Sequence, residues 1–270
     1  MISTDTLTAV KEFWNTQSCG ENLYLRSGEK ISYELQRIKR YQLEPEILNF
    51  AEFEKYTGKN VLEIGVGLGA DHQMFAEAGA NLVGIDLTPR AIEHVRKRFM
   101  LFGLEPNLHI ANAESLHFEN NSFDLVYSWG VIHHSPNTQK IAEEVYQKLK
   151  PGGIAKIMIY HKYSLVGFML WLRYALLKLK PWQSLTKIYA DYLESPGTKA
   201  YSKKEARQLF SKFHSIKIQT TLTHADLLSQ GVGQRHHAFL LTFAKAIWPR
   251  WFFKLFFRRC GLFMMIEAEK

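Results

Sequence analysis

The chain lacks a set of paired cysteines, a long apolar run and a secretory signal. Its 270 residues contain two cysteines, which are too few for a disulfide framework and indicate a reducing compartment. An apolar stretch at residues 165–179 is too short for a membrane span and contains Arg173 and Lys178. Residues 1–10 have neither the basic start nor the apolar core of a signal peptide. We therefore expect a cytoplasmic protein.

Several functional signatures are also missing. No RRM or KH signature occurs, and no Asn-Pro-Pro-Tyr or Asp-Pro-Pro-Tyr type motif follows the fourth predicted strand, so nucleic acid is not an expected partner. His72 and the pair His236-His237 do not combine with cysteines or carboxylates at metal-ligand spacing. We therefore expect no metal site.

The charge of the chain is unevenly distributed. The net charge is +8, but residues 1–160 hold 16 Lys/Arg and 20 Asp/Glu, whereas residues 161–270 hold 18 and 6. This asymmetry fits an acidic partner, such as nucleic acid, anionic lipid, or a phosphorylated or carboxylated substrate, and it fits equally well a positively charged surface that serves only solubility. The apolar content of 46% indicates a globular core.

Short apolar runs alternate with amphipathic stretches through most of the chain, as in a doubly wound α/β sheet. Strands are predicted at residues 60–64, 81–86, 108–111, 123–128, 154–160, 215–221 and 262–268. Helices are predicted at residues 73–78, 89–102, 137–149 and 202–212, preceded by short helices in the first sixty residues that break at Pro45. The run Lys150-Pro151-Gly152-Gly153 predicts a strong stop before the fifth strand.

A glycine-rich segment joins the first two predicted strands. Residues 63–71 read Glu-Ile-Gly-Val-Gly-Leu-Gly-Ala-Asp, so the backbone can approach a ligand closely. With Asp86 at the end of the second strand, Gly65, Gly67 and Ala70 satisfy the dinucleotide fingerprint. Glu63 favours a ligand with a cationic amino group instead, because a carboxylate at this position would repel a pyrophosphate.

Further motifs follow in order over residues 60–160. They are Ala111-Asn112-Ala113-Glu114-Ser115-Leu116-His117-Phe118, then Phe123-Asp124-Leu125-Val126, then Lys150-Pro151-Gly152-Gly153. Together with the glycine-rich segment and Asp86, this series resembles the class I S-adenosylmethionine-dependent methyltransferases. The run Gly130-Val131-Ile132-His133-His134 is similar to the G-V-L-H-H type run of their small-molecule branch.

The resemblance implies a fold, a reaction and a cofactor. The fold is an α/β, Rossmann-like, doubly wound seven-stranded sheet, mostly parallel with an antiparallel last strand, and with helical cap insertions. The reaction is methyl transfer from S-adenosylmethionine, with S-adenosylhomocysteine as the product. The acceptor is a small molecule, with oxygen or nitrogen favoured over carbon, and the oligomeric state stays open.

The resemblance also implies which residues bind the cofactor. The glycines Gly65, Gly67 and Gly69 would admit the methionine and ribose, and Glu63 would orient the ammonium group, directly or through water. Asp86 would accept from both ribose hydroxyls. The adenine would be held by Leu87 and Leu116 and by the loop residues Asn112, Ala113 and Glu114. Asn112 stands where the family has an aspartate, so we expect weaker adenine recognition.

Histidines placed after the central strands are the candidate bases. An oxygen or protonated nitrogen acceptor must lose a proton, and histidine titrates near neutrality. His133 and His134 follow the fourth strand beside the expected sulfonium, and they are the catalytic candidates. His161, past the fifth strand, is a second choice.

The chain is predicted to divide into an arm and a capped core. Residues 1–58 would form an N-terminal helical arm or lid, and residues 59–270 the core, with cap insertions at about 161–200 and 224–260. Connections after parallel strands emerge at the ligand-binding edge, so these segments would roof the site and enclose a small substrate. The candidate substrate-binding residues are Trp14, Tyr24, Tyr33, Arg37, Tyr160 and His161.

Alternative functions remain at the sequence level. Bulky apolar residues mix with basic ones in the run from Trp248 to Arg259, which can lie in a lipid interface and would suit a lipid or quinone acceptor at a membrane surface. RNA methylation is less favoured, as is a binding protein that keeps the cofactor without catalysis. A dehydrogenase would require nicotinamide-dependent activity.

Overall fold

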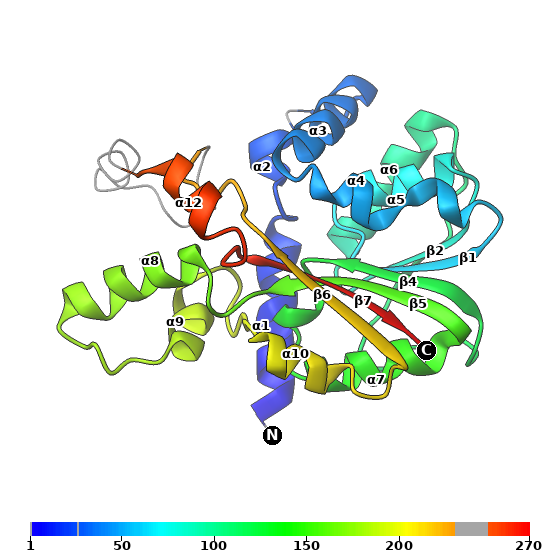
Figure 1. Ribbon diagram of the computed structural model, residues 1–270. Coiled ribbons are helices and arrows are strands. Elements are labelled where there is room, and N and C mark those ends of the chain that lie inside the picture. Colours follow the sequence, from blue (N-terminus) through cyan, green and yellow to red (C-terminus); the bar gives the residue numbers. More distant parts are fainter. Residues whose placement is uncertain (1, 26, 230–247) are drawn as a thin grey trace.

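A single seven-stranded sheet crosses the molecule in the order β3-β2-β1-β4-β5-β7-β6 (Figure 1). In this computed structural model the described residues are 2–25, 27–229 and 248–270, and for residues 2–5, 23 and 24 the description covers the backbone only. The strands are β1 (Asn60–Ile64), β2 (Asn81–Asp86), β3 (Leu108–Ile110), β4 (Phe123–Trp129), β5 (Leu149–Tyr160), β6 (Ser215–Thr221) and β7 (Phe263–Glu269). Strand β7 runs antiparallel to β5 and β6, and the other pairings are parallel. The predicted sheet, with its antiparallel last strand, is confirmed.

Helices surround this sheet and extend beyond one end of it. They are α1 (Ile2–Thr16), α2 (Glu21–Tyr24), α3 (Lys30–Leu43), α4 (Glu46–Ala51), α5 (Ala70–Glu77), α6 (Pro89–Phe102), α7 (Thr138–Lys148), α8 (Leu165–Tyr174), α9 (Leu185–Tyr192), α10 (Lys203–Leu209) and α12 (Arg250–Phe256). Short 3-10 turns are η1 (Phe53–Tyr56), η2 (Ile132–His134) and η3 (Leu176–Lys178). No helix among the described residues has both the length and the apolar character needed to cross a bilayer.

Local sequence signals fix several element ends. Helix α6 begins after Thr88, and the Thr88 hydroxyl accepts a hydrogen bond from the Ala91 amide. The helix has proline at its first position, and it ends at Gly103, whose backbone is in the left-handed region. The sequence predicts that strand β5 begins at residue 154, but its pairing with β4 already begins at Leu149, opposite Phe123. The register then shifts between Phe123 and Leu125, and this irregularity accommodates the glycines that suggested a stop.

The two faces of the sheet bury different sets of side chains. Alternate residues of the central strands, such as Val61 and Leu125, pack against α4, η1 and α5 on one face. Their neighbours Leu62 and Val126 pack against α7 and α10 on the other. The central strands are therefore apolar on both faces, as expected for a parallel sheet covered by helices.

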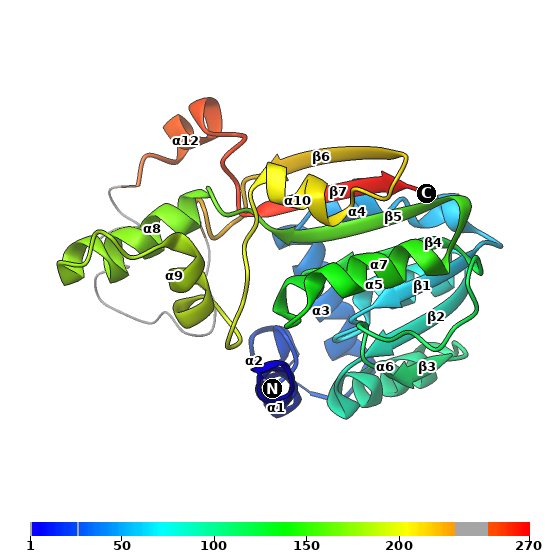
Figure 2. The ribbon, with the colours of Figure 1, turned by 90° about the horizontal axis from the view of Figure 1, so that it is seen from below.

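The N-terminal helices and the first insertion gather at one edge of the sheet. Helices α8, α9 and α12 project together beyond the strand ends in both views (Figures 1 and 2). The predicted insertion at 161–200 forms α8, η3 and α9. The predicted insertion at 224–260 contains α12, and its residues 230–247, with Arg235, His236 and His237, lie outside the described part of the chain.

Candidate functional site

A cavity of about 630 Å³ lies at the carboxyl ends of the parallel strands. Its floor comes from the loops that leave β1, β2, β4 and β5. Its walls are largely apolar and come from the capping elements, namely Leu7, Val10, Phe13 and Trp14 of α1 and Val166, Met169, Leu170 and Leu172 of α8. This is the edge at which doubly wound sheets bind ligands, and the capping helices enclose it.

The three glycines after β1 have different roles. Each has a positive φ, 82° at Gly65, 52° at Gly67 and 77° at Gly69. A Cβ at Gly65 would lie 2.2 Å from the Val131 side chain, and one at Gly69 would lie 2.9 Å from Val95. A Cβ at Gly67 meets no atom within 4 Å. Gly65 and Gly69 are therefore required by packing, whereas Gly67 leaves open space on the cavity side for a ligand.

A buried arginine holds this glycine loop against the N-terminal arm. The Arg98 guanidinium donates to the Leu68 carbonyl at 3.0 Å and to the Tyr33 carbonyl at 3.2 Å, so it bridges the loop and α3. It also donates to the side-chain oxygens of Gln36 and Gln73, at 2.7 and 2.6 Å. Burial lowers the pKa of Arg98 to about 10, which leaves it charged at neutral pH.

Asp86 faces the cavity at the end of β2, together with Leu87. Its Oδ1 accepts from the Thr88 amide and hydroxyl, at 2.9 and 2.8 Å, and its Oδ2 accepts from the Gly67 amide at 3.3 Å. Burial raises the pKa of Asp86, and these hydrogen bonds oppose the shift. A carboxylate has about four acceptor sites, so Asp86 has about one left to accept from a ligand hydroxyl.

The loop after β3 contributes only part of the predicted adenine site. Asn112 and Ala113 line the cavity. The Asn112 side-chain oxygen accepts from the Glu114 amide at 3.0 Å. Glu114 itself accepts from the Ser135 hydroxyl and from the Asn137 amide, and Leu116 is packed into the core. Among the described residues, Glu114 and Leu116 thus belong to the support of the site, because neither reaches the cavity.

A buried acid that the sequence interpretation passed over lies beside the glycine loop. Asp71, on the first turn of α5, accepts from Arg40 Nε at 2.9 Å and Nη2 at 2.7 Å. The Tyr41 and Tyr127 hydroxyls also donate to it, at 3.0 and 2.9 Å. Burial opposes the charge, but the Arg40 guanidinium and these donors lower the pKa of Asp71. The signal was present in the sequence, because an acid directly after a glycine loop and on a helix start is placed to meet a ligand cation.

Glu63 reaches the cavity from β1 but is also engaged below the glycine loop. Its Oε2 lies 2.9 Å from His72 Nδ1, and both side chains are buried. Burial and the neighbouring Asp71 charge raise the pKa of Glu63. Burial lowers the pKa of His72 to about 3, so this histidine is neutral in the folded protein.

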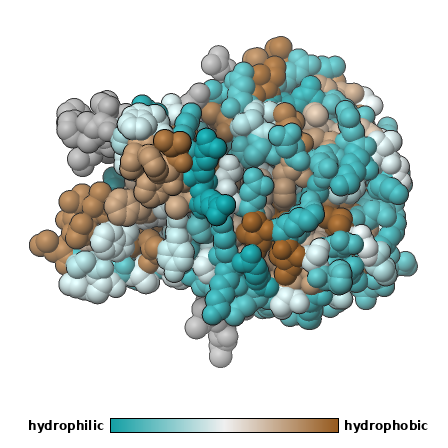
Figure 3. All heavy atoms as spheres, in the orientation of Figure 1, coloured by the Kyte–Doolittle hydropathy of each residue, from teal (hydrophilic) through white to brown (hydrophobic). Residues whose placement is uncertain are grey.

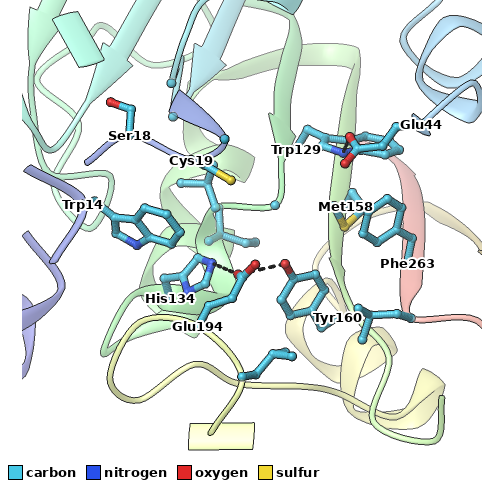
Figure 4. A pocket seen from close by; sticks show the side chains of 18 of the residues that line it. Trp14, Ser18, Cys19, Glu44, Trp129, His134, Met158, Tyr160, Glu194 and Phe263 are labelled. Atoms are coloured by element: carbon cyan, nitrogen blue, oxygen red, sulfur yellow. Dashed lines mark hydrogen bonds and ion pairs between the residues drawn. The ribbon is translucent and has the colours of Figure 1, made fainter. Parts of the chain in front are cut away.

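His134 and Glu194 meet at the wall of the same cavity (Figure 4). The distance from His134 Nε2 to Glu194 Oε2 is 3.4 Å, and the Tyr160 hydroxyl donates to the same oxygen at 2.9 Å. On the other side of the ring, Nδ1 lies 2.8 Å from the Ser195 hydroxyl and 3.1 Å from that of Thr198. The Thr198 hydroxyl donates to the Ser195 carbonyl, whereas the Ser195 hydroxyl can either donate to Nδ1 or accept from it. These contacts therefore fit both neutral tautomers of His134, and Nε2 faces the Glu194 carboxylate in each of them.

The neighbouring histidine is placed differently. His133 is fully buried, neither of its ring nitrogens has a hydrogen-bond partner, and it does not border the described cavity. Its ring packs against Tyr160 with centroids 4.1 Å apart. Burial and the nearby His134 lower the pKa of His133 well below its ordinary value. Of the two predicted bases, only His134 is in contact with the space where a substrate would lie.

The predicted substrate-binding residues also separate into two groups. Trp14 and Tyr160 line the cavity, and the Trp14 ring packs edge-on against His134 at 5.2 Å between centroids. The other side chains that the structure describes lie elsewhere: Tyr33 bonds to His94, Arg37 pairs with Glu77, and His161 lies near the Gly261 carbonyl. The side chain of Tyr24 is outside the described part of the molecule.

The site contains one group of side chains with ligand atoms close enough to hold a metal ion. One atom each of His133, His134 and Glu194 lies within 4.8 Å of the others. These residues come from two distant segments, so the linear spacing gave no indication of the group. The expectation of a metal-free site stays a prediction, and metal analysis of the purified protein tests it.

Comparison with known proteins points to the same chemistry as this geometry. Residues 62–157 match the protein family described as "Methyltransferase domain". Over 121 residues the chain is 36% identical to phosphoethanolamine N-methyltransferase 2 of Caenorhabditis elegans, covering 43% of this chain and 26% of that protein. Over 101 residues it is 32% identical to sterol 4-C-methyltransferase strm-1 of the same organism, covering 37% of this chain and 30% of that protein.

A solved structure extends the likeness to nearly the whole fold. Phosphoethanolamine N-methyltransferase 2 of Haemonchus contortus, in complex with phosphomonomethylethanolamine and S-adenosylhomocysteine, superposes with a TM-score of 0.59 at 16% identity, covering 97% of this chain and 60% of that one. The aligned segments span less than a third of the two curated relatives. Residues 62–157 therefore match a methyltransferase domain, and the chain shares the fold of this solved methyltransferase structure.

Proposed function

We propose that this protein transfers a methyl group from S-adenosylmethionine to an oxygen or nitrogen atom of a small molecule enclosed in the cavity. The observation that carries the proposal is that one cavity is lined by two chemically different sets of residues. One set is the glycine loop with Asp86, and the other is His134 with Glu194. A cofactor and an acceptor can thus meet in a single space that the capping helices shield from water.

The glycine loop and its neighbours fit this cofactor. Gly67 leaves room on the cavity side, and Asp86 lines the cavity with about one acceptor site left for a ribose hydroxyl. Glu63, Asp71 and Arg40 also line the cavity, and they are the charged groups that would meet the ammonium and carboxylate of the methionine part. When bound, S-adenosylmethionine provides an activated methyl group on a sulfonium and leaves as S-adenosylhomocysteine.

The His134 imidazole is the group that accepts the acceptor's proton. The Ser195 and Thr198 hydroxyls hold the ring by its Nδ1, and the Glu194 carboxylate stabilises the imidazolium that forms. Tyr160 fixes Glu194 in this orientation. The apolar walls from α1 and α8 exclude water, so the chain's contribution is alignment, desolvation and a base.

A second candidate acceptor is a lipid or quinone met at a membrane surface. The observation that favours it is the apolar lining from α8, which continues to a cluster of exposed apolar residues on the capping elements. In both cases the cofactor and the base are the same, and only the route by which the acceptor enters differs.

Calorimetric titration with S-adenosylmethionine, S-adenosylhomocysteine and NADH tests the cofactor assignment. We expect micromolar binding of the two sulfur compounds, lost in Asp86→Ala and kept in Glu105→Ala, an exposed acid distant from the cavity. Binding of NADH alone would instead support a dehydrogenase. Binding without methyl transfer to any acceptor in a broad screen would favour a non-catalytic cofactor-binding protein.

A further inference from the structure

Large apolar side chains are exposed on the capping elements outside the cavity. We call this surface the capping patch, and it has two parts. The first comprises Phe168, Leu176, Leu177, Leu179 and Trp182, next to α8 and η3, and the second comprises Trp251, Phe252, Leu255 and Phe256 of α12. Their exposed fractions range from 37% at Phe252 to 83% at Leu179. Figure 3 shows apolar residues gathered at this end of the molecule, over α8 and α12.

Basic residues are interspersed in the capping patch, and acidic ones are absent from its segments. Lys178 and Lys180 follow α8, and Lys254, Arg258 and Arg259 belong to α12 and the turn after it, all of them exposed. Residues 161–190 and 248–262 contain no Asp or Glu. Within the part of the chain that the structure describes, none of these five cations pairs with an acid. The patch is therefore both apolar and strongly positive.

The capping patch meets the cavity at Leu177. This residue is 70% exposed and also lines the cavity, as do Met169, Arg173 and Trp248 next to the two parts of the patch. The cavity therefore reaches the surface within the patch, and a bilayer that docks here would lie against this opening. A molecule that leaves the bilayer could enter the cavity without crossing bulk water.

The chemistry of the patch distinguishes between possible occupants. A second copy of this chain would bring two positive, acid-free surfaces together, which like-charge repulsion opposes. Single-stranded nucleic acid would use the cations and aromatic rings, but it gains little from the leucines Leu176, Leu177, Leu179 and Leu255. An anionic bilayer suits all three kinds of side chain in the patch. Tryptophan lies at the headgroup level, leucine and phenylalanine enter the acyl boundary, and lysine and arginine contact the lipid phosphates.

We propose that the capping patch docks on an anionic lipid bilayer and places the cavity opening against it. Apolar burial and headgroup attraction act together here, so binding needs both the exposed rings and the cations. The inference goes beyond the proposed function, since docking requires neither cofactor nor turnover. It also gives the acceptor a class, namely a molecule dissolved in or attached to the membrane.

Vesicle flotation of the full chain tests the docking. We expect binding to vesicles that contain phosphatidylglycerol, weak binding to phosphatidylcholine alone, and release as salt is raised. Trp251→Ser combined with Leu255→Ser, and separately Lys254→Glu combined with Arg258→Glu, should each weaken binding by about tenfold or more. The matched control is Arg96→Glu combined with Met100→Ser on α6, which changes an exposed cation and an exposed apolar residue outside the patch.

A second measurement reports whether the patch itself enters the lipid. Brominated phospholipids should quench the fluorescence of Trp182 and Trp251, and the Trp251→Ser variant should lose its share of the quenching. Absence of binding to anionic vesicles would overturn the proposal, as would equal binding by the patch variants and the wild type. Patch-dependent binding of single-stranded RNA without vesicle binding would replace the bilayer with nucleic acid. Calorimetry with S-adenosylmethionine remains informative whichever way the vesicles behave, so the docking and the proposed function fail separately.

Discussion

At the scale of single residues, a Glu194 variant should lose catalytic rate but keep its affinity for S-adenosylmethionine. The Glu194 carboxylate faces His134 Nε2 at 3.4 Å and lines the same cavity. In Glu194→Gln the imidazolium loses its counter-charge, so we expect kcat to fall by about ten- to a hundredfold, less than the roughly 100- to 10,000-fold contribution of a general base itself.

Two measurements distinguish this role from a structural one. S-adenosylmethionine affinity should be unchanged in Glu194→Gln, and the control Glu143→Gln, a partly exposed acid on α7, should match the wild type in rate. A rise in KM for the acceptor with an unchanged kcat would mean that Glu194 positions the acceptor and does not assist the base.

The burial of His133 leads to a prediction about the pH dependence of stability. The side chain is fully buried without hydrogen-bond partners, and its folded-state pKa lies well below 6.5. The unfolded chain therefore binds a proton that the folded chain rejects, and stability from this group is lost as pH falls below about 6.5, by about 1.4 kcal/mol per pH unit. In His133→Leu this loss is absent.

Urea unfolding at pH 7 and pH 5 measures the difference. The variant should lose less stability than the wild type between these two values, and at pH 7 it should be at least as stable because two unpaired polar atoms are removed. An equal loss of unfolding free energy in the variant and the wild type between pH 7 and pH 5 would contradict the prediction that buried His133 resists protonation. Retained methyl transfer in the variant would leave His134 as the base, whereas its loss would support the sequence prediction for His133.

At the scale of elements, the glycine loop should respond in opposite ways to two alanine substitutions. Gly65→Ala places a Cβ 2.2 Å from Val131 at a φ of +82°, so we expect destabilisation by about 2–4 kcal/mol from overlap and strain. Gly67→Ala meets no protein atom within 4 Å, so its stability cost is only the left-handed backbone, about 1–2 kcal/mol. Its methyl group occupies space on the cavity side, so S-adenosylmethionine affinity should fall instead.

Gly103 serves as a control that separates the effect on S-adenosylmethionine binding from the effect on stability. Gly103 has a φ of +69°, has no atom within 4 Å of a built Cβ, and lies at the end of α6 away from the cavity. Gly103→Ala should therefore cost about as much stability as Gly67→Ala without changing calorimetric affinity. Equal affinity in Gly67→Ala and the wild type would show that the cofactor does not approach the loop at this point.

The elements also show how far a local pattern predicts structure. β1 and β2 fall where the sequence places them, because short apolar runs bounded by turn residues carry their own signal. The cavity residues Arg40 and Glu194 could not be found in this way, because an exposed-looking helix position and a loop acid acquire meaning only when α3 and the first insertion close over the sheet. Asp71 was within reach, since it follows the glycines directly.

At the scale of the whole molecule, helix α1 forms a wall of the site, and an ion pair joins α2, the next helix along the chain, to α6. Glu21 accepts from Arg90 Nε at 2.7 Å and Nη2 at 2.6 Å, which ties α2 to α6. These bonds, and to a lesser extent the nearby His94, lower the pKa of Glu21 to about 2. The pair's contribution is therefore complete above about pH 4.5 and is lost only as pH falls toward 2, so at neutral pH it needs a mutation to be broken.

We expect Arg90→Ala to loosen the arm without unfolding the core. Arg90 is 40% exposed, so the loss in global stability should not exceed about 1 kcal/mol. Phe13 and Trp14 line the cavity from the same arm, so KM for the acceptor should rise and backbone amides of α1 should exchange hydrogen faster, whereas amides of β1 and β4 should not. Arg96→Ala on the exposed side of α6 is the control. If the α1 amides exchange at the wild-type rate while KM rises, the ion pair affects the acceptor directly. If neither the exchange rate nor KM changes, the arm is a fixed part of the core and no lid moves during turnover.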